Sequence, residues 1–319
     1  MTTLELNGTT AKERMTEILK TLEQGVKDVF TSGRYAEYLS VMSRFWRYSY
    51  RNSLLIMMQR SDATRVASIG TWNRLGRSVN RGEQGIRILA PSPYKREEWV
   101  DLTDRDGKPV VNPDTGKTLQ VRRTVEVMGF RPVVVFDVAQ TSGDPLPELA
   151  TDLTGDVHDY DRLLEAIRLI AGCPVLIWPL KGRAKGHYSV TNREIVIRVG
   201  LSPLQTIKTA LHEIAHARLH DPHNQQINQP AEQSCHQKDR RTIEVEAESI
   251  AFTVMAHYAY DTRSYSFGYI SIWSTGKELT ELHNSLRLIQ EESARIISDL
   301  DLVMNPVPAE QQSESVSAS

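Results

Sequence analysis

The feature that most constrains this chain is a His-Glu-x-x-His sequence at residues 212–216, inside a segment expected to be one helix. Residues four apart project from the same face of a helix, so the imidazoles of His212 and His216 can bind one metal ion. The glutamate between them, Glu213, can then act as a base on a water molecule at that ion. This pattern predicts a catalytic site with one zinc ion, although other divalent metals remain open.

The residues around this motif predict a helix that follows a strand. Ser202 is expected to cap the helix, with Pro203 as its first residue and Gln205 as the reciprocal capping partner. Apolar residues then recur at helical spacing, at positions 204, 207, 211, 214 and 215. An apolar strand is expected just before, over residues 194–199. A strand followed by a helix with two histidines is the arrangement expected of zinc-dependent hydrolases with this motif.

A catalytic zinc site needs a third protein ligand, and a second helical segment from Glu244 onward offers one. At about 100° per residue, Glu244 and Glu248 share one face, whereas Glu246 points roughly the opposite way. We therefore expect Glu244 to be the third ligand. Glu248, one turn later, is expected to hold a ligating imidazole through its other nitrogen. Glu246 is expected to be a solvated residue.

Other interpretations of the histidines compete with this one. A zinc site with a third histidine would need it six residues after His216, but this position holds Pro222. His220 and His223 are better explained as surface or helix-end residues, which the C-terminus of a helix favours. An ordinary amphipathic helix with its polar residues outside would also fit the motif alone. The helix cap, the strand and the acidic second helix favour the metal site.

Length and composition predict an ordinary globular protein. At 319 residues the chain suits two domains, and its 40% hydrophobic and 24% charged residues are enough to form a real core. The two cysteines, Cys173 and Cys235, have no spacing that suggests a disulfide framework or a cysteine-based metal site. No apolar run approaches the ~18 residues of a membrane span, and residues 1–10 lack the apolar core of a signal peptide. We expect a cytoplasmic protein.

Hydrophobic periodicity predicts a mixed α+β fold. Helices are expected over 11–30, 35–59, 161–171 and 277–303, and strands over 86–89, 130–138 and 174–178. Residues 94–124 are expected to form an extended hairpin, and the strand at 130–138 is expected to be buried on both faces. The domain boundaries follow from composition: a first domain at 1–140, a linker at 141–156, a second domain at 157–304, and a disordered tail at 305–319.

A strongly basic segment lies between Arg44 and Arg96. It contains eleven basic residues and only two acids, which leaves a charge of +9, and six aromatic residues are interleaved with them. Cationic side chains neutralise phosphates, and aromatic faces stack on unpaired bases, so this combination favours binding of single-stranded nucleic acid. The alternative is a solvated basic surface in which Trp46 and Trp72 belong to the core.

The side chains that we expect to contact nucleic acid are polar or aromatic residues of this segment: Arg44, Arg47, Tyr48, Arg51, Asn52, Trp72, Arg74, Arg77, Arg81 and Arg87.

Two parts of the chain carry motifs of a known family. Residues 35–138 resemble the N-terminal single-stranded-DNA-binding domain of ArdC-type antirestriction proteins. Residues 186–272 look like the zincin-like metallopeptidase part of the same proteins, which is related to the ImmA/IrrE peptidases. The matching stretches are Tyr48-Ser49, 52–56, 71–79 and 82–88 in the first part, and 212–220, 244–251 and 265–270 in the second.

The resemblance implies single-stranded DNA binding, protection of incoming plasmid or phage DNA from restriction, and a metal-bearing peptidase-like fold. Two alternatives stay open. The zinc site is structural and proteolytically idle, or the protein is a zinc endopeptidase that removes a DNA-binding repressor. In the peptidase mechanism, Glu213 takes a proton from water and passes it to the leaving amine. Tyr265 and Tyr269 are the candidates for stabilising the oxyanion, although the sequence places neither ring.

Overall fold

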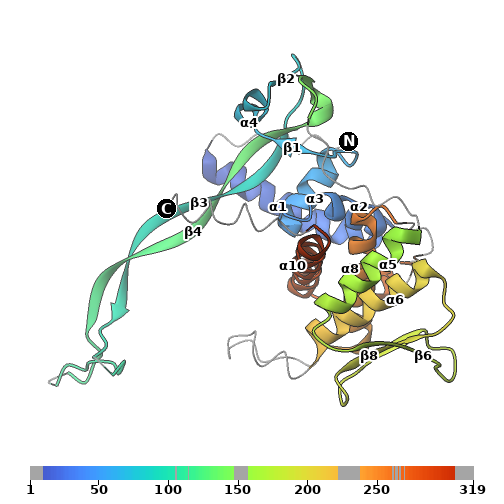
Figure 1. Ribbon diagram of the computed structural model, residues 1–319. Coiled ribbons are helices and arrows are strands. Elements are labelled where there is room, and N and C mark those ends of the chain that lie inside the picture. The colour runs from blue at the N-terminus through green and yellow to red at the C-terminus, as the bar shows by residue number, and fades with distance from the viewer. Residues whose placement is uncertain are drawn as a thin grey trace, which may run out of the picture.

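The structure, a computed structural model, describes residues 10–104, 106–113, 115–146, 157–221, 238–260, 262, 265, 267–268 and 270–305. Its helices and strands form a mixed fold of the expected α+β class. Figure 1 shows a central group of helices, a long twisted hairpin that extends away from it, and a small sheet at its lower edge.

The first part of the chain alternates short helices with strands. Its elements are α1 (Ala11–Thr31), α2 (Tyr35–Arg44), α3 (Tyr50–Gln59), β1 (Val66–Ala67), α4 (Ile69–Arg74), β2 (Arg77–Val79), β3 (Ile86–Asp101), β4 (Gln120–Asp137), the 3-10 turn η1 (Val138–Gln140) and β5 (Thr141–Gly143). The prediction of one helix over 35–59 is wrong. Ser49 has an extended backbone and its side chain accepts a hydrogen bond from the amide of Asn52, so it caps a new helix after a short loop.

The hairpin of β3 and β4 is longer than the predicted 94–124. The two strands pair antiparallel from Ile86 with Val135 to Asp101 with Gln120. The prediction that residues 130–138 are buried on both faces is wrong, because the Phe130 and Val134 side chains are exposed and only the end of β4 is buried. Most of the hairpin extends beyond the helices (Figure 1), so little packs against either face.

Two side-chain amides of α3 bind the outer edge of β3. The side chain of Asn52 donates to the carbonyl of Leu89 and accepts from its amide, both at 2.9 Å. Gln59 does the same for Arg87, at 2.8 and 2.9 Å. The strand order β1-β4-β3 leaves this edge without a neighbouring strand. The amides of α3 therefore replace ladder hydrogen bonds that the sheet does not provide.

The second part of the chain contains α5 (Val157–Ile170), β6 (Val175–Trp178), β7 (Gly186–Ser189), β8 (Glu194–Arg198), α6 (Pro203–Ala215), the π-helical turn η2 (His216–His220), α8 (Arg240–His257), α9 (Ile270–Ser274) and α10 (Leu279–Met304). The strand order is β6-β8-β7, with β8 in the centre, and the sequence analysis missed β7. Strand β8 leads directly into α6, as predicted.

A continuous apolar core joins both parts of the chain. It contains residues from α1 to α10, and α8 packs against α6, α10 and α2. Tyr35 of α2 also hydrogen-bonds to Ser249 of α8 at 2.8 Å in the interior. Of the expected linker, residues 141–143 form β5, which pairs with β2, and residues 147–156 lie outside the described ones. Among the described residues, every helix is too short or too polar to cross a bilayer.

Candidate metal centre

Helix α6 starts as its sequence predicts, but its cap differs in one detail. The side chain of Ser202 accepts a hydrogen bond from the amide of Gln205 at 3.3 Å, and Pro203 is the first helical residue. The Gln205 side chain does not complete a reciprocal cap. It donates to Thr209 at 3.2 Å and accepts from Lys185 at 2.7 Å, because these partners lie on its side of the helix.

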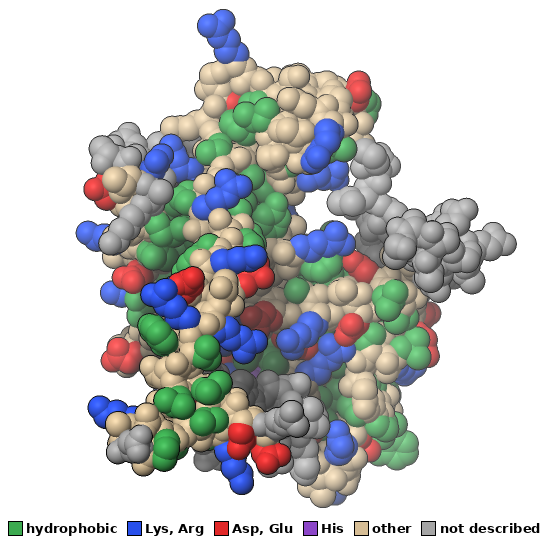
Figure 2. Space-filling model, turned by 90° about the vertical axis from the view of Figure 1, so that its left-hand side faces the viewer, with side chains coloured by type: hydrophobic (Ala, Val, Ile, Leu, Met, Phe, Trp, Pro, Cys, Tyr) green, Lys and Arg blue, Asp and Glu red, His purple; other side chains and the backbone are tan. Residues whose placement is uncertain are grey.

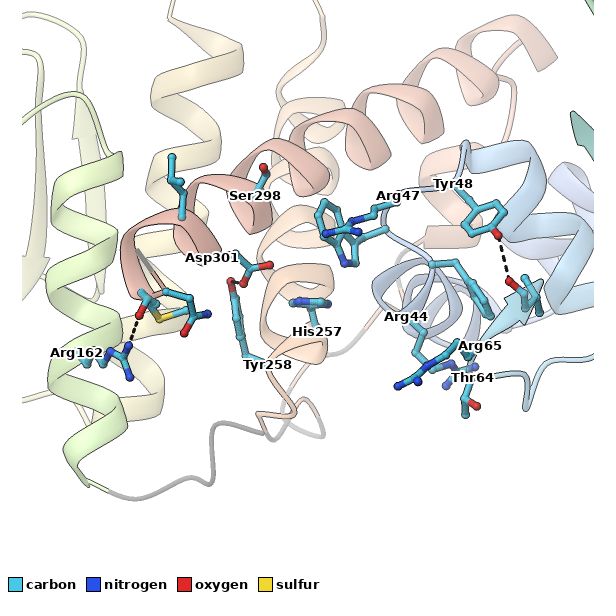
Figure 3. Close-up of a pocket in the computed structure, with 16 residues that line it drawn as sticks. Arg44, Arg47, Tyr48, Thr64, Arg65, Arg162, His257, Tyr258, Ser298 and Asp301 are labelled. Carbon is cyan, nitrogen blue, oxygen red and sulfur yellow. Dashed lines mark hydrogen bonds between the residues drawn. The ribbon is translucent and has the colours of Figure 1, made fainter. Parts of the chain in front are cut away.

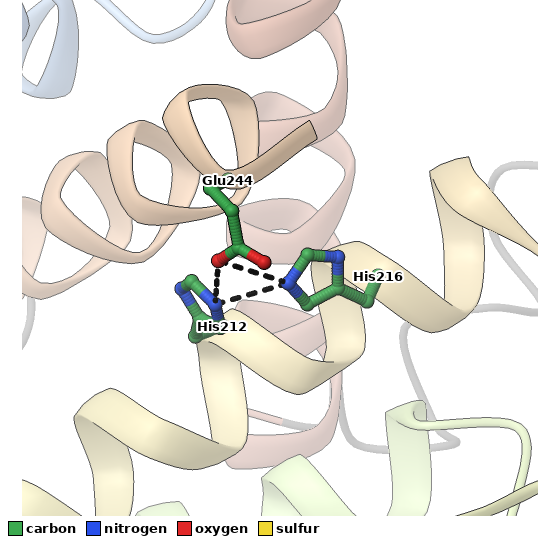
Figure 4. Close-up of side chains that lie close together, drawn as sticks. All are labelled: His212, His216 and Glu244. Atoms are coloured by element: carbon green, nitrogen blue, oxygen red, sulfur yellow. Dashed lines mark hydrogen bonds and ion pairs between the residues drawn. The ribbon is translucent and has the colours of Figure 1, made fainter. Parts of the chain in front are cut away.

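The three predicted ligands meet at one point between α6 and α8 (Figure 4). The Nε2 atoms of His212 and His216 lie 3.0 Å apart, and Glu244 Oε2 lies 3.4 and 3.8 Å from them. Tetrahedral bonds of about 2.0–2.1 Å would separate ligand atoms by roughly 3.3–3.4 Å. The observed separations bracket this value, so one divalent ion fits among these atoms with small side-chain adjustments.

Glu248 lies behind His212, as the sequence predicts. Its Oε2 atom is 3.3 Å from Nδ1 of His212, which is buried and lacks a well-aligned hydrogen bond. The other oxygen forms an ion pair with Lys208 at 2.8 Å. Lys208 also lies 3.4 Å from the centre of the Tyr265 ring. Lys208 thus holds one oxygen of the Glu248 carboxylate, and the other oxygen faces the nitrogen of His212 that points away from the ion site.

The catalytic candidate Glu213 is buried on the side of α6 that faces β7. Burial raises the pKa of its carboxyl group, while the charge of His212 and a hydrogen bond from the amide of Tyr188 lower it. Gly186 leaves room for this arrangement. A Cβ atom there would lie 2.5 Å from Thr209 Cγ2 and 3.4 Å from Glu213 Oε1. Neither Gly186 nor Tyr188 is among the predicted site residues, because β7 is not among the predicted strands.

The other candidate histidine ligand, His216, contacts His220, a residue at the end of η2 as expected, and His220 in turn contacts Glu246, for which the prediction of a solvated residue is wrong. The Nδ1 atom of His216 lies 3.0 Å from Nδ1 of His220, and Nε2 of His220 lies 3.1 Å from Glu246. The side chains of His220 and Glu246 are only 6% and 0% exposed, so they are not solvated residues. Lys238 and Ser285 also hydrogen-bond to Glu246, at 2.9 to 3.0 Å. These contacts offset the cost of burying its charge.

His216 and His220 are the first and last residues of the π-helical turn η2. In η2 the backbone is wound more loosely than in an α-helix, and residues four apart still lie on the same side. Glu246 lies on the face of α8 opposite Glu244, as predicted, but α10 covers that face. Ser285 of α10 donates a hydrogen bond to the Glu246 carboxylate there, at 2.9 Å.

The carboxylates around His212 favour a cation at this site. Burial lowers the pKa of His212, but its contacts with the carboxylates of Glu244 and Glu248 raise it overall to about 9. Burial, followed by the charges of His212 and His220, lowers the pKa of His216 to about 3. A positive charge is therefore stabilised on His212 and disfavoured on His216. A divalent ion at the same place would supply this positive charge and satisfy the same carboxylates.

Tyr265 and Tyr269 are the two tyrosines predicted as candidates for oxyanion stabilisation. The hydroxyl of Tyr265 contacts the sulfur of Met255 at 3.1 Å, and burial raises its pKa far above the usual value. This hydroxyl points into the apolar interior. Tyr269 and His223 lie outside the described residues.

Of the ten residues predicted to bind nucleic acid, five are exposed cations: Arg44, Arg47, Arg51, Arg74 and Arg81. The side chains of Tyr48, Arg77 and Arg87 are partly buried.

Three of these predicted contacts have structural roles instead. Asn52 binds the backbone of β3, as described above. Trp72 is only 1% exposed, and its indole donates to the carbonyl of Phe136 at 2.9 Å, so no base can reach its ring. Arg77 hydrogen-bonds to both the hydroxyl and the carbonyl of Thr141 and holds β5 against β2. Burial and internal hydrogen bonds therefore exclude the predicted DNA contacts of Asn52 and Trp72 in this structure.

Comparison with known proteins agrees with this architecture. Residues 9–130 match the family model of the N-terminal domain of anti-restriction factor ArdC, and residues 170–260 match the IrrE N-terminal-like domain. An uncharacterised protein of Bacillus anthracis is 24% identical over 328 residues, a match that covers 94% of this chain and 54% of that protein. The chain thus spans about half the length of this relative.

Two solved structures of the antirestriction protein ArdC from plasmid R388 are also similar. The Mn(II)-bound structure has a TM-score of 0.50 and 16% identity, over 89% of this chain and 98% of that one. The metal-free structure has a TM-score of 0.46 and 18% identity, over 80% and 84%. Identities this low show likeness of fold alone. The chain thus carries a match to the N-terminal domain of anti-restriction factor ArdC, followed by a match to the IrrE N-terminal-like domain.

Proposed function

We propose that this protein acts in the cytoplasm, where it binds single-stranded DNA and protects incoming plasmid or phage DNA from restriction. We also propose that it carries one zinc ion in a peptidase-type site. The observation that carries the proposal is the convergence of His212, His216 and Glu244 beside the buried carboxyl group of Glu213. The match to the ArdC N-terminal domain supports the role in antirestriction.

The site residues suit hydrolysis of a peptide bond. An ion held by these ligands supplies Lewis acidity toward a peptide carbonyl and makes water more acidic. Glu213 takes up a proton on its carboxylate from the attacking water and returns it to the departing nitrogen. Burial raises the pKa of this carboxyl group, which brings it closer to neutral pH and suits both steps. The backbone amide of Tyr188 donates a hydrogen bond to the Glu213 carboxylate and holds it in position.

Single-stranded DNA binding is supported by the exposed arginines of the N-terminal part. Figure 2 shows Lys and Arg side chains gathered around a hollow on the side of the hairpin. Cations on a surface neutralise phosphates and release counterions, so affinity falls as salt rises. An affinity for an oligothymidylate that hardly changes between low and physiological salt contradicts this part of the proposal.

A Glu213→Gln variant tests whether catalysis is needed. The change keeps the size of the side chain and removes its ability to accept the proton. Glu165→Gln is the matched control, because this carboxylate is exposed and forms an ion pair with the exposed side chain of Arg168. Restriction of transferred plasmid DNA is measured in cells, together with bound zinc and oligothymidylate affinity in vitro. Lost protection with metal and DNA binding intact supports catalysis.

Retained protection in Glu213→Gln supports the alternative of a DNA-binding protein with an idle metal site. The IrrE-like domain at 170–260 favours a further candidate function, an endopeptidase that removes a DNA-binding repressor. In that case one DNA-binding protein disappears from cells that express the wild type and persists with Glu213→Gln. An unchanged proteome contradicts it.

A further inference from the structure

A groove with a volume of about 700 Å³ lies between the two parts of the chain. One wall is the loop between α2 and α3 together with the start of β1, and the other is formed by α5 and the C-terminal ends of α8 and α10. Figure 3 shows Arg162 at one end and Arg44 and Arg65 at the other, with Arg47 and His257 between them. The groove lies outside the metal centre, although α8 contributes to both.

The charge of this groove is positive. Four arginines line it, whereas Asp301 is its only acidic residue among the described ones and accepts a hydrogen bond from Tyr258 at 2.8 Å. The guanidinium of Arg65 has no acidic partner among the described residues. Burial lowers the pKa of His257 and so favours its uncharged form. Cations that face one another across a groove and outnumber its acidic residues fit a chain of anionic groups.

A flat stacking surface lies in the middle of the groove. The guanidinium of Arg47 lies over the ring of Trp46, 4.6 Å from its centre. His257 contacts the edge of the same indole, with ring centres 5.8 Å apart, and hydrogen-bonds to the carbonyl of Ser43 at 3.1 Å. The stacked pair is therefore fixed from the α8 side. Bases that are not paired stack on aromatic rings and on guanidinium planes alike.

We propose that a stretch of single-stranded DNA lies in this groove, with phosphates at Arg65 and Arg162 and a base against Arg47 and Trp46. This inference rests on the proposed binding of single-stranded DNA and specifies where it occurs. The DNA site then extends beyond the N-terminal domain, because Arg162 and His257 belong to the second part of the chain. The stacking surface favours DNA, which carries a flat base beside each phosphate, over an acidic peptide.

The test measures the affinity of the full chain for a fluorescent 15-nucleotide oligothymidylate. Arg65→Ala and Arg162→Ala are compared with Arg168→Ala, which removes the same charge from an exposed residue of the same helix, α5, that does not line the groove. Because Arg162 also hydrogen-bonds to the carbonyl of Met304, Ser298→Glu provides a second variant that adds a negative charge to the groove.

We expect each groove variant to weaken binding about fivefold or more, and Arg168→Ala less than twofold. Each lost phosphate contact also lowers the slope of log affinity against log salt by about 0.7. If the wild type binds the oligonucleotide and the groove variants behave like Arg168→Ala, the groove assignment is overturned while DNA binding stands.

If the wild type does not bind the oligonucleotide, the proposed function itself fails. Displacement by a poly-glutamate of equal charge, as effective as unlabelled oligothymidylate, also overturns the assignment, since the groove then takes acidic protein segments.

Discussion

Asn52 offers the sharpest test of how the N-terminal part is built. Its sequence context predicts a contact with nucleic acid, whereas the structure shows its amide bound to both backbone groups of Leu89, at 2.9 Å each. An Asn52→Ala change leaves one buried amide and one buried carbonyl without partners. Each unsatisfied group costs about 1–3 kcal/mol. Partial relaxation and entry of water reduce the sum, so we expect a loss of about 2–4 kcal/mol in the free energy of unfolding.

Urea unfolding followed by tryptophan fluorescence measures this loss. Arg51→Ala is the matched control, because Arg51 is the neighbouring residue and its side chain is exposed, with a hydrogen bond to the hydroxyl of Tyr50. We expect this control to keep its stability within about 0.5–1 kcal/mol. Gln59→Ala should cost less than Asn52→Ala, since its bonds to Arg87 are only partly buried. An Asn52→Ala variant that is as stable as the wild type and binds oligothymidylate more weakly refutes the structural role.

Three further predictions follow from single contacts. In protein stripped of metal, the folded-state pKa of His212 is raised to about 9, so the stability that this shift contributes is complete below pH ~6.5 and is lost as pH rises through 9. Thermal melts should show this decline in the wild type and not in His212→Ala. Equal declines in the two proteins speak against it. Gly186→Ala should destabilise the protein by about 1–3 kcal/mol through its clash with Thr209, and Thr209→Ser should restore part of the loss; no rescue in the double variant argues against this contact. Trp72→Phe should cost about 1–3 kcal/mol in urea unfolding, because it removes the indole hydrogen bond to the Phe136 carbonyl and part of a buried ring, and it should leave DNA affinity unchanged; the opposite pattern returns Trp72 to the DNA site.

The candidate ligands could be predicted from the sequence because helix geometry relates the residues within each of the two helices. His212 and His216 are four apart on one helix, and the periodicity of α8 separates Glu244 and Glu248 from Glu246. The cap at Ser202 and the strand before it are equally local. In the structure these residues lie on the helix faces that their spacing along the sequence predicts.

What the sequence could not show depends on which surfaces other elements cover. Glu246 was expected to be solvated because nothing local indicates that α10 covers that face of α8. Its partner His220 is the last residue of a π-helical turn, which has no simple sequence signal. The basic and aromatic segment likewise does not reveal that Trp72 faces the end of β4 or that Asn52 meets the edge of β3. In each case the deciding contact comes from residues more than twenty positions away.

Bound metal per chain tests the central claim most directly. Purified protein is equilibrated with a low concentration of free zinc, and the bound ion is counted by elemental mass spectrometry for the wild type and for His212→Ala, Glu244→Ala and Glu213→Gln. We expect about one ion in the wild type and in Glu213→Gln, and a large loss in the two ligand variants. One ion retained in both His212→Ala and Glu244→Ala, or none in the wild type, contradicts the assignment of this site.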